Sequence, residues 1–253
     1  MSCPRFRSFA SYNTSAVIIR TSGDELLLIQ QIDHAALAER LMAAWQPGGF
    51  RDSPTRAEIL FATRRHDDGW IDEDAAPLVD PATGGLLDYV HAPDEIRRRI
   101  WPRGVERLSA FPYPAALVAQ HALHLFEKYR ADPEWSAFFD RMERLRAANL
   151  AAAAPRTEEE LRRDYFFVRM ADLLSLQFCD DWREPQRFDD FESWWDGTRL
   201  TIVPDPFGGS TVSMTMTARR LPHIRFDARA AADAFAAAPL LTVSGVAAGA
   251  AAR

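Results

Sequence analysis

The chain has 253 residues, of which 47% are hydrophobic and 26% are charged, a composition typical of globular proteins. Chains of up to about 250 residues are commonly one domain, so we expect a single domain over residues 1–253. The formal net charge of −6 argues against a protein that binds nucleic acid regardless of sequence, because such proteins need a basic surface to neutralise phosphates.

Targeting signals and cysteines indicate a cytoplasmic protein. No segment has the charged start and apolar run of a signal peptide, and none reaches the roughly 18 apolar residues of a membrane span. Cys3 lies in a polar N-terminal segment and Cys179 ends an apolar helical stretch, so we expect no disulfide. Lys128 is the only lysine, which we attribute to biased base composition of the coding DNA, without functional meaning. The oligomeric state is not predicted.

The N-terminal third is predicted to begin with a β-hairpin. Residues 15–30 contain two apolar runs on either side of a Ser-Gly-Asp turn. Helices are expected from Asp33 to about residue 46 and from about Thr55 to Gly69. Residues 70–92 carry turn signals and are predicted to be a long loop, which in a compact domain is often functional.

The remainder is predicted to be helical first and β-rich afterwards. Helices are expected near residues 94–108, 114–130, 133–150 and 158–180. After Arg199 we expect strands at 200–203, 212–217, 223–226 and 240–243, a short helix at 228–237, and a frayed tail beyond Val246. The predicted fold class is therefore mainly α: a helical bundle (core about 33–182) with a small sheet built from the N-terminal hairpin and the C-terminal strands (about 199–244).

Two polar residues lie on apolar helix faces. His66 shares its face with Ala62 and Ile59, and Asp172 lies on a stripe that includes Val168 and Leu176. A buried carboxylate costs several kcal/mol unless it is paired or binds a metal. The structural alternatives are a salt bridge from Asp172 to a nearby arginine, Arg169, and a core histidine bonded to a backbone carbonyl.

The joint pattern favours a metal site. His34 begins one helix, the adjacent pair His66-Asp67 ends another, and Asp172 lies in a late helix. Two imidazoles and two carboxylates suit one divalent ion such as Fe, Mn, Zn, Co or Ni. Adjacent side chains in a regular helix point about 100° apart. His66 and Asp67 can therefore bind one ion most easily in the last turn of a helix that ends at Gly69.

The order H…HD…D resembles the HD-domain superfamily of metal-dependent phosphohydrolases. A longer set of segments, in order, resembles the bacterial domain-of-unknown-function family 3891, which we regard as HD-like: QIDHAALAERLMAAW, ILFATRRHDDGW, DEDAAPLVDPATGGLLDYV, AQHALHL and MADLLSLQFC. The resemblance implies a metal site with four ligands: His34, His66, Asp67 and Asp172. It also implies that His121 reaches a second metal or the substrate, and we expect a mononuclear site.

Neighbouring residues have open roles. Asp68 either orients a ligand or takes a proton from water at the ion, or else is a solvated carboxylate. Arg65, like Arg64, either clamps a phosphate or is solvated. Trp70 is either a core aromatic or a wall of the substrate site, and His124 is expected to be an ordinary, partly buried histidine.

Two functions remain open. The first is hydrolysis of a phosphate ester of a small molecule or nucleotide, with Asp68, His121 and Arg65 acting on the substrate beside the ion. The alternative is a non-catalytic metal or ligand binder, a sensor or scaffold. The sequence offers no phosphate-binding loop, no lysine in the region of the site and no second ligand cluster, so the non-catalytic alternative stays open beside hydrolysis. An open coordination position beside a pocket would favour hydrolysis.

Overall fold

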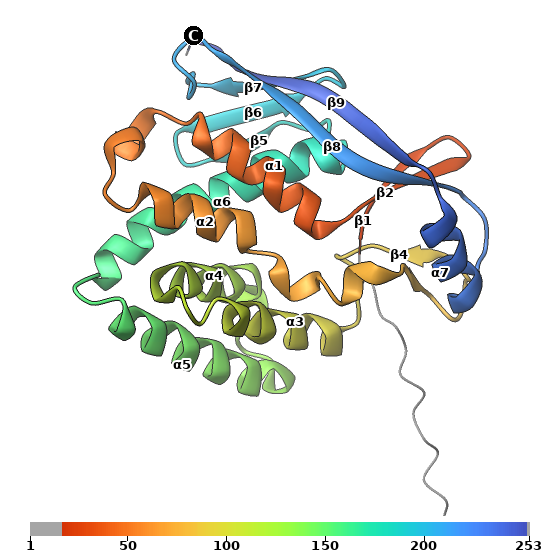
Figure 1. The fold of residues 1–253 in the computed structure, drawn as a ribbon, viewed down its shortest axis with the longest axis horizontal. Helices are drawn as coiled ribbons and strands as arrows, with labels where there is room; N and C mark the ends of the chain where they lie inside the picture. Colours follow the sequence, from red (N-terminus) through yellow and green to blue (C-terminus); the bar gives the residue numbers. More distant parts are fainter. Residues whose placement is uncertain (1–16, 252–253) are drawn as a thin grey trace, which may run out of the picture.

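The computed structural model describes residues 17–251, so that Cys3 and the start of the predicted hairpin segment lie outside the described residues. Helices pack beneath a large sheet, and the long helices α1 and α6 lie next to it (Figure 1). The helices of the described part are α1 (Gln31–Ala43), α2 (Arg56–Arg65), α3 (Asp94–Arg107), α4 (Pro112–Leu125), α5 (Ser136–Ala152), α6 (Glu158–Cys179) and α7 (Ala228–Ala237). None of these helices is both long and apolar enough to cross a membrane.

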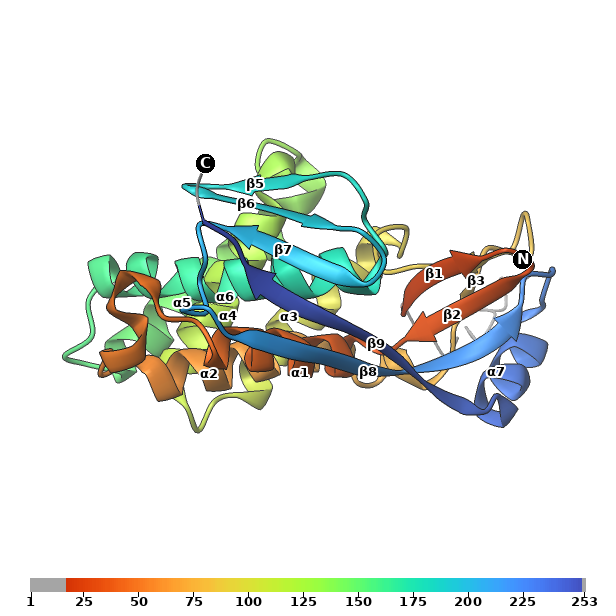
Figure 2. The same ribbon diagram turned by 90° about the horizontal axis from the view of Figure 1, so that it is seen from above.

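The main sheet has seven strands in the order β1-β2-β8-β9-β7-β6-β5, and it curls so that its two edges lie far apart (Figure 2). All neighbours are antiparallel except β7 and β9, which are parallel. The strands are β1 (Ile18–Ser22), β2 (Glu25–Ile29), β5 (Gln186–Phe188), β6 (Phe191–Trp195), β7 (Arg199–Val203), β8 (Thr211–Pro222) and β9 (Leu240–Gly249). A separate pair comprises β3 (Leu78–Val79) and β4 (Leu86–Leu87).

The predicted fold class, a mainly-α bundle with a small sheet, is wrong. Strands β8 and β9 have 12 and 10 residues, and β5 and β6 were not predicted at all. The segment beyond Val246 is not frayed, because β9 pairs with β8 on one side and β7 on the other up to Gly249. Alanine and glycine have weak β-propensity, so pairing with two neighbours, and not local sequence, makes this segment a strand. The strand predicted at 223–226 is absent.

Other elements agree with the sequence. The N-terminal hairpin is confirmed, with Ser22 paired to Glu25 across the turn. Helices α1 to α7 lie within a few residues of their predicted bounds, and residues 70–92 hold only short 3₁₀ turns and the β3–β4 pair. Buried apolar side chains form a continuous core from these helices into the sheet, including Trp45 of the α1 end and Trp195 of β6.

The segment His66–Trp70, which we call the metal turn, packs directly on the backbone of α3. It continues from α2 into a 3₁₀ turn, η2 (Asp68–Trp70). Gly69 is buried, and a Cβ atom there would overlap the backbone carbonyl of Ile100. Gly104 of α3 lies opposite, and Arg103 donates from Nε to the Gly69 carbonyl oxygen at 3.1 Å. The glycine is therefore required by the close approach of two backbones.

Replacing Gly69 by alanine is expected to destabilise the protein by about 1–3 kcal/mol, because the methyl group must displace the α3 backbone. Gly85→Ala is the matched control, since the only neighbour within 4 Å of its added Cβ is the Thr83 hydroxyl. Urea unfolding followed by circular dichroism gives both values. Equal stability of the two variants would contradict the close packing of the metal turn on α3.

Candidate metal centre

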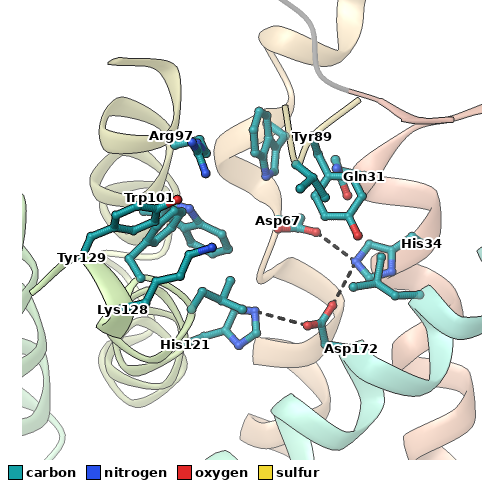
Figure 3. Close-up of a pocket in the computed structure, with 15 residues that line it drawn as sticks. Gln31, His34, Asp67, Tyr89, Arg97, Trp101, His121, Lys128, Tyr129 and Asp172 are labelled. Carbon is teal, nitrogen blue, oxygen red and sulfur yellow. Dashed lines mark hydrogen bonds and ion pairs between the residues drawn. The ribbon is translucent and has the colours of Figure 1, made fainter. Parts of the chain in front are cut away.

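The four sequence-predicted ligands come from three segments of the chain and meet in the interior, and Figure 3 shows three of them: His34, Asp67 and Asp172. His34 lies in the first turn of α1, whose N-terminus is held by Asp74, a buried residue that accepts from the Gln31 backbone nitrogen at 2.8 Å. His66 is the C-cap residue of α2, and Asp67 follows it directly. Asp172 lies in the middle of α6. All four side chains are buried.

The ligand atoms are spaced as neighbours around one ion. The Nε2 atoms of His34 and His66 are 3.2 Å apart, and Asp67 Oδ2 lies 3.0 Å and 3.2 Å from them. Asp172 Oδ1 lies 3.4 Å from each of these Nε2 atoms. Bonds of about 2.0–2.2 Å to a metal place adjacent ligand atoms roughly 3.0–3.4 Å apart. The buried group His34, His66 and Asp172 can therefore hold a metal ion.

Hydrogen bonds on the far side of each ring fix which nitrogen faces the cluster. His66 Nδ1 lies 2.7 Å from the Thr63 carbonyl oxygen, which can only accept, so Nδ1 carries the proton. Ser175 Oγ donates to the Asp172 carbonyl and lies 2.8 Å from His34 Nδ1, so it accepts from that ring. When neutral, both rings therefore present an unprotonated Nε2 to the cluster. In that state two nitrogen lone pairs and two carboxylates converge with no donor between them, an arrangement that a cation would stabilise.

The charges of the cluster agree with this geometry. Burial favours the neutral form of Asp67, but the adjacent His66 and His34 outweigh it and hold the pKa of Asp67 well below its usual value. Burial acts in the same direction on Asp172, and again His66 and the other imidazoles lower its pKa. Burial opposes the charged form of His66, yet Asp67 and Asp172 raise its pKa well above the ordinary value. Without a metal ion, a proton on His66 is the positive charge that the two carboxylates attract.

Replacing Ser175 by alanine is expected to weaken metal binding about 10- to 100-fold, because the partner that orients His34 Nδ1 is lost. Metal titration of the purified variant measures this change. Ser193→Ala is the matched control: this serine is also buried and donates to Gln177 Oε1, away from the cluster. A loss of metal affinity equal in both serine variants would point to general destabilisation instead of ligand orientation.

One side of the cluster opens into a pocket of about 170 Å³. His34, Asp67 and Asp172 lie at one end of its lining, together with His121 of α4. His121 Nε2 is 3.7 Å from Asp172 Oδ2, and its Nδ1 is 3.2 Å from the Tyr165 hydroxyl. Burial lowers the pKa of His121 to about 4, so the ring is neutral at pH 7. The structure thus places His121 beside the predicted ligands and in the same cavity.

The other sequence-predicted residues lie in different places. Asp68 is buried and pairs with Arg65, and neither residue lines the pocket. Trp70 does line it, whereas His124 lies outside, with its ring 5.7 Å from that of Tyr165.

The two arginines named beside these residues lie elsewhere. Arg64 donates to the Ile32 carbonyl oxygen and lies near Glu39. Arg169 lies over the Phe188 ring at 4.2 Å, and Asp172 instead faces the imidazoles.

Sequence reasoning missed the residues that line the rest of the pocket. Contrary to the expectation of no lysine near the site, Lys128 lines the pocket, as does Arg97 of α3. Aromatic side chains that were not predicted supply most of the remaining wall, beside Trp70: Tyr89, Trp101, Phe126 and Tyr129. The sequence held one weak signal, the spacing of Arg97 and Trp101 four residues apart on one helix face, and nothing in it placed Lys128 at the site.

Comparison with known proteins identifies a family but indicates no function. Residues 17–223 match the family described as "Protein of unknown function (DUF3891)". No curated protein and no solved structure matches the chain. The matched segment includes His34, the metal turn, His121 and Asp172, and it comprises most of the chain. This protein therefore belongs to the DUF3891 family.

Proposed function

We propose that this protein is a metal-dependent phosphohydrolase of HD type that acts on a phosphate ester of a small molecule. The observation that carries the proposal is the one-sided opening of the ligand cluster: His34, Asp67 and Asp172 all line a pocket. A structural metal is usually enclosed by four protein ligands, whereas a catalytic one keeps a position open toward the substrate. The order of the ligands along the chain, H…HD…D, supports the HD assignment.

The donor set suits one divalent ion of the Fe, Mn, Zn, Co or Ni group, because imidazole nitrogen and carboxylate oxygen are ligands that these metals share. His34, His66, Asp67 and Asp172 would hold it. Such an ion supplies a Lewis acid that polarises a phosphoryl oxygen and makes a water molecule more acidic.

The chain's own residues account for the remaining steps. In hydrolysis the water oxygen bonds to phosphorus, the bond from phosphorus to the ester oxygen breaks, and the departing alcohol receives a proton. His121 is neutral at pH 7, since its pKa is about 4, and we assign it to hydrogen bonding with the substrate or the attacking water. Lys128 and Arg97 take the phosphate-binding role that the sequence suggested for Arg65, which pairs with Asp68 outside the pocket.

The second candidate is a non-catalytic metal or ligand binder. The enclosed, buried position of His66 and the second hydrogen bonds to both imidazoles would serve a stable structural site equally well. The pocket beside the cluster favours hydrolysis, because a purely structural ion has no need of an adjoining cavity with two cationic side chains.

Metal analysis followed by a phosphatase panel tests the proposal. We expect about one divalent ion per chain, and release of phosphate from at least one small phosphate ester when that metal is present. Chelation and Asp172→Asn should both remove the activity. A protein that binds one ion tightly and hydrolyses no phosphate ester in the panel would establish the non-catalytic alternative.

A further inference from the structure

The wall of the pocket opposite the ligand cluster is cationic (Figure 3). Lys128 Nζ lies 4.9 Å from the centre of the Tyr129 ring, and within residues 17–251 no carboxylate oxygen lies within 4.0 Å of this ammonium. The Arg97 guanidinium lies 5.7 Å from the same ring and pairs with Asp94. Lys128 therefore lies against the ring and hydroxyl of Tyr129 without a carboxylate partner among these residues, and an anionic ligand group would bind it better.

Charge balance indicates what that ligand group is. A divalent ion among Asp67 and Asp172 is neutralised by these two carboxylates, since the ligating imidazoles are neutral. A phosphate monoester carries about −1.5 to −2 at pH 7. The ion centre alone leaves this charge uncompensated, and Lys128 supplies positive charge at the other end of the same cavity, beside Arg97, whose charge is shared with Asp94.

The size and lining of the cavity limit the organic part of the ligand. The pocket of about 170 Å³ is open to solvent, and its enclosed part is similar in size to the roughly 150 Å³ engineered cavity that holds benzene. The rings of Trp70, Trp101 and Phe126 are buried in its wall. Aromatic faces pack best against a flat ring. One such ring therefore fits against this wall.

We propose that the substrate is the phosphomonoester of a small compound with a single flat aromatic ring, whose phosphate lies between the metal centre and the Lys128–Arg97 pair. This inference rests on the proposed function for turnover, but the ligand class can be measured without it. The ring packs on the aromatic wall, and Lys128 is a specificity-determining residue that contacts the phosphate.

Binding is tested first, with a probe that cannot be hydrolysed. Because Lys128 is the only lysine, its acylation by an amine-reactive reagent can be followed on a single peptide by mass spectrometry. Benzylphosphonate should slow this acylation in the metal-loaded protein, and cyclohexylmethylphosphonate, which has the same carbon count but a puckered ring, should bind about three- to tenfold more weakly. Equal protection by both compounds, or none by either, would overturn the ligand class.

Variants of Lys128 then test whether this residue contacts the ligand. Lys128→Gln should weaken benzylphosphonate binding, measured by calorimetry, by about tenfold or more, and Lys128→Arg should restore most of it. Arg130→Gln is the matched control, because Arg130 lies two residues away, pairs with Glu127 and Glu143, and does not line the pocket. The same loss in Lys128→Gln and Arg130→Gln would refute a direct contact.

Measuring hydrolysis of phosphate esters distinguishes a failure of the ligand class from a failure of the proposed function. Benzyl phosphate and cyclohexylmethyl phosphate share a similar leaving alcohol, so a lower KM for the benzyl compound, lost in Lys128→Gln, supports both. Binding of benzylphosphonate through Lys128 with no hydrolysis of any ester supports the ligand class and overturns the hydrolase proposal. Efficient hydrolysis of glycerol phosphate or adenosine monophosphate, unaffected by Lys128→Gln, supports the hydrolase and overturns the ligand class.

Discussion

Replacing Asp67 by asparagine is expected to reduce metal affinity by more than about 100-fold while the fold is retained. Asp67 Oδ2 lies 3.0 Å and 3.2 Å from the two Nε2 atoms, so its charge is central to the cluster. Asparagine conserves the volume, and therefore leaves no cavity, but it offers a neutral and weaker ligand. Metal content after purification and titration of the metal-free protein measure the change.

The adjacent residue provides the control for this experiment. Asp68 is also a buried aspartate, but its carboxylate pairs with Arg65 and does not face the cluster. Asp68→Asn should therefore retain the metal. Full metal occupancy in Asp67→Asn, or equal loss in both variants, would count against the four-ligand site.

The second large effect is the response of the thermal midpoint to chelation, which should depend strongly on pH. Binding to the native state alone stabilises a protein by RT ln(1 + [L]/Kd), about 2.7 kcal/mol at a hundredfold excess over Kd. Protons compete with the ion at His66, whose pKa the two carboxylates raise in the metal-free state against the effect of burial. Chelator should therefore lower the midpoint markedly near pH 8 and much less near pH 5.5.

In the metal-free protein, by contrast, stability should decrease as pH rises over part of this range. A raised folded-state pKa at His66 contributes stability that is present below the unfolded value of about 6.5 and is lost as pH rises through the folded value. The lowered pKa of Asp67 contributes stability above about 3.9 that is lost as pH falls through its folded value. Chelated protein should thus lose stability from about pH 6.5 upward. A thermal midpoint that changes with neither chelator nor added metal at any pH would exclude a metal site.

The candidate ligands could be predicted because their sequence context is local. His66 and Asp172 each lie on an apolar helix face, and Gly69 in the metal turn marks a helix end, so the 3.6-residue period alone predicts that both side chains point inward. The same period predicted the bounds of the helices to within a few residues. Their convergence depends on tertiary packing, and in the sequence only the order H…HD…D predicted it.

The large sheet and the cationic wall could not be predicted for a different reason. Residues 246–249 continue strand β9 because β7 and β8 pair with its two sides, and an Ala- and Gly-rich segment does not signal such partners. Lys128 lies in an exposed 3₁₀ turn after α4, where a lysine is normally just solvated. Only the packing of α3 against α4 brings Lys128 and Arg97 to the same cavity.

The missing side chains at Gly69 and Gly104 make the metal turn and α3 a mechanically coupled pair. With backbone directly against backbone, α3 has no flexible side chain in between to absorb a displacement, and interiors packed at this density transmit strain. The same helix carries Arg97 and Trp101 into the pocket. A compound that shifts α3 on binding must therefore shift Asp67 as well. Thermodynamic reciprocity then requires that the ion changes the affinity for this compound by the same factor by which the compound changes the affinity for the ion.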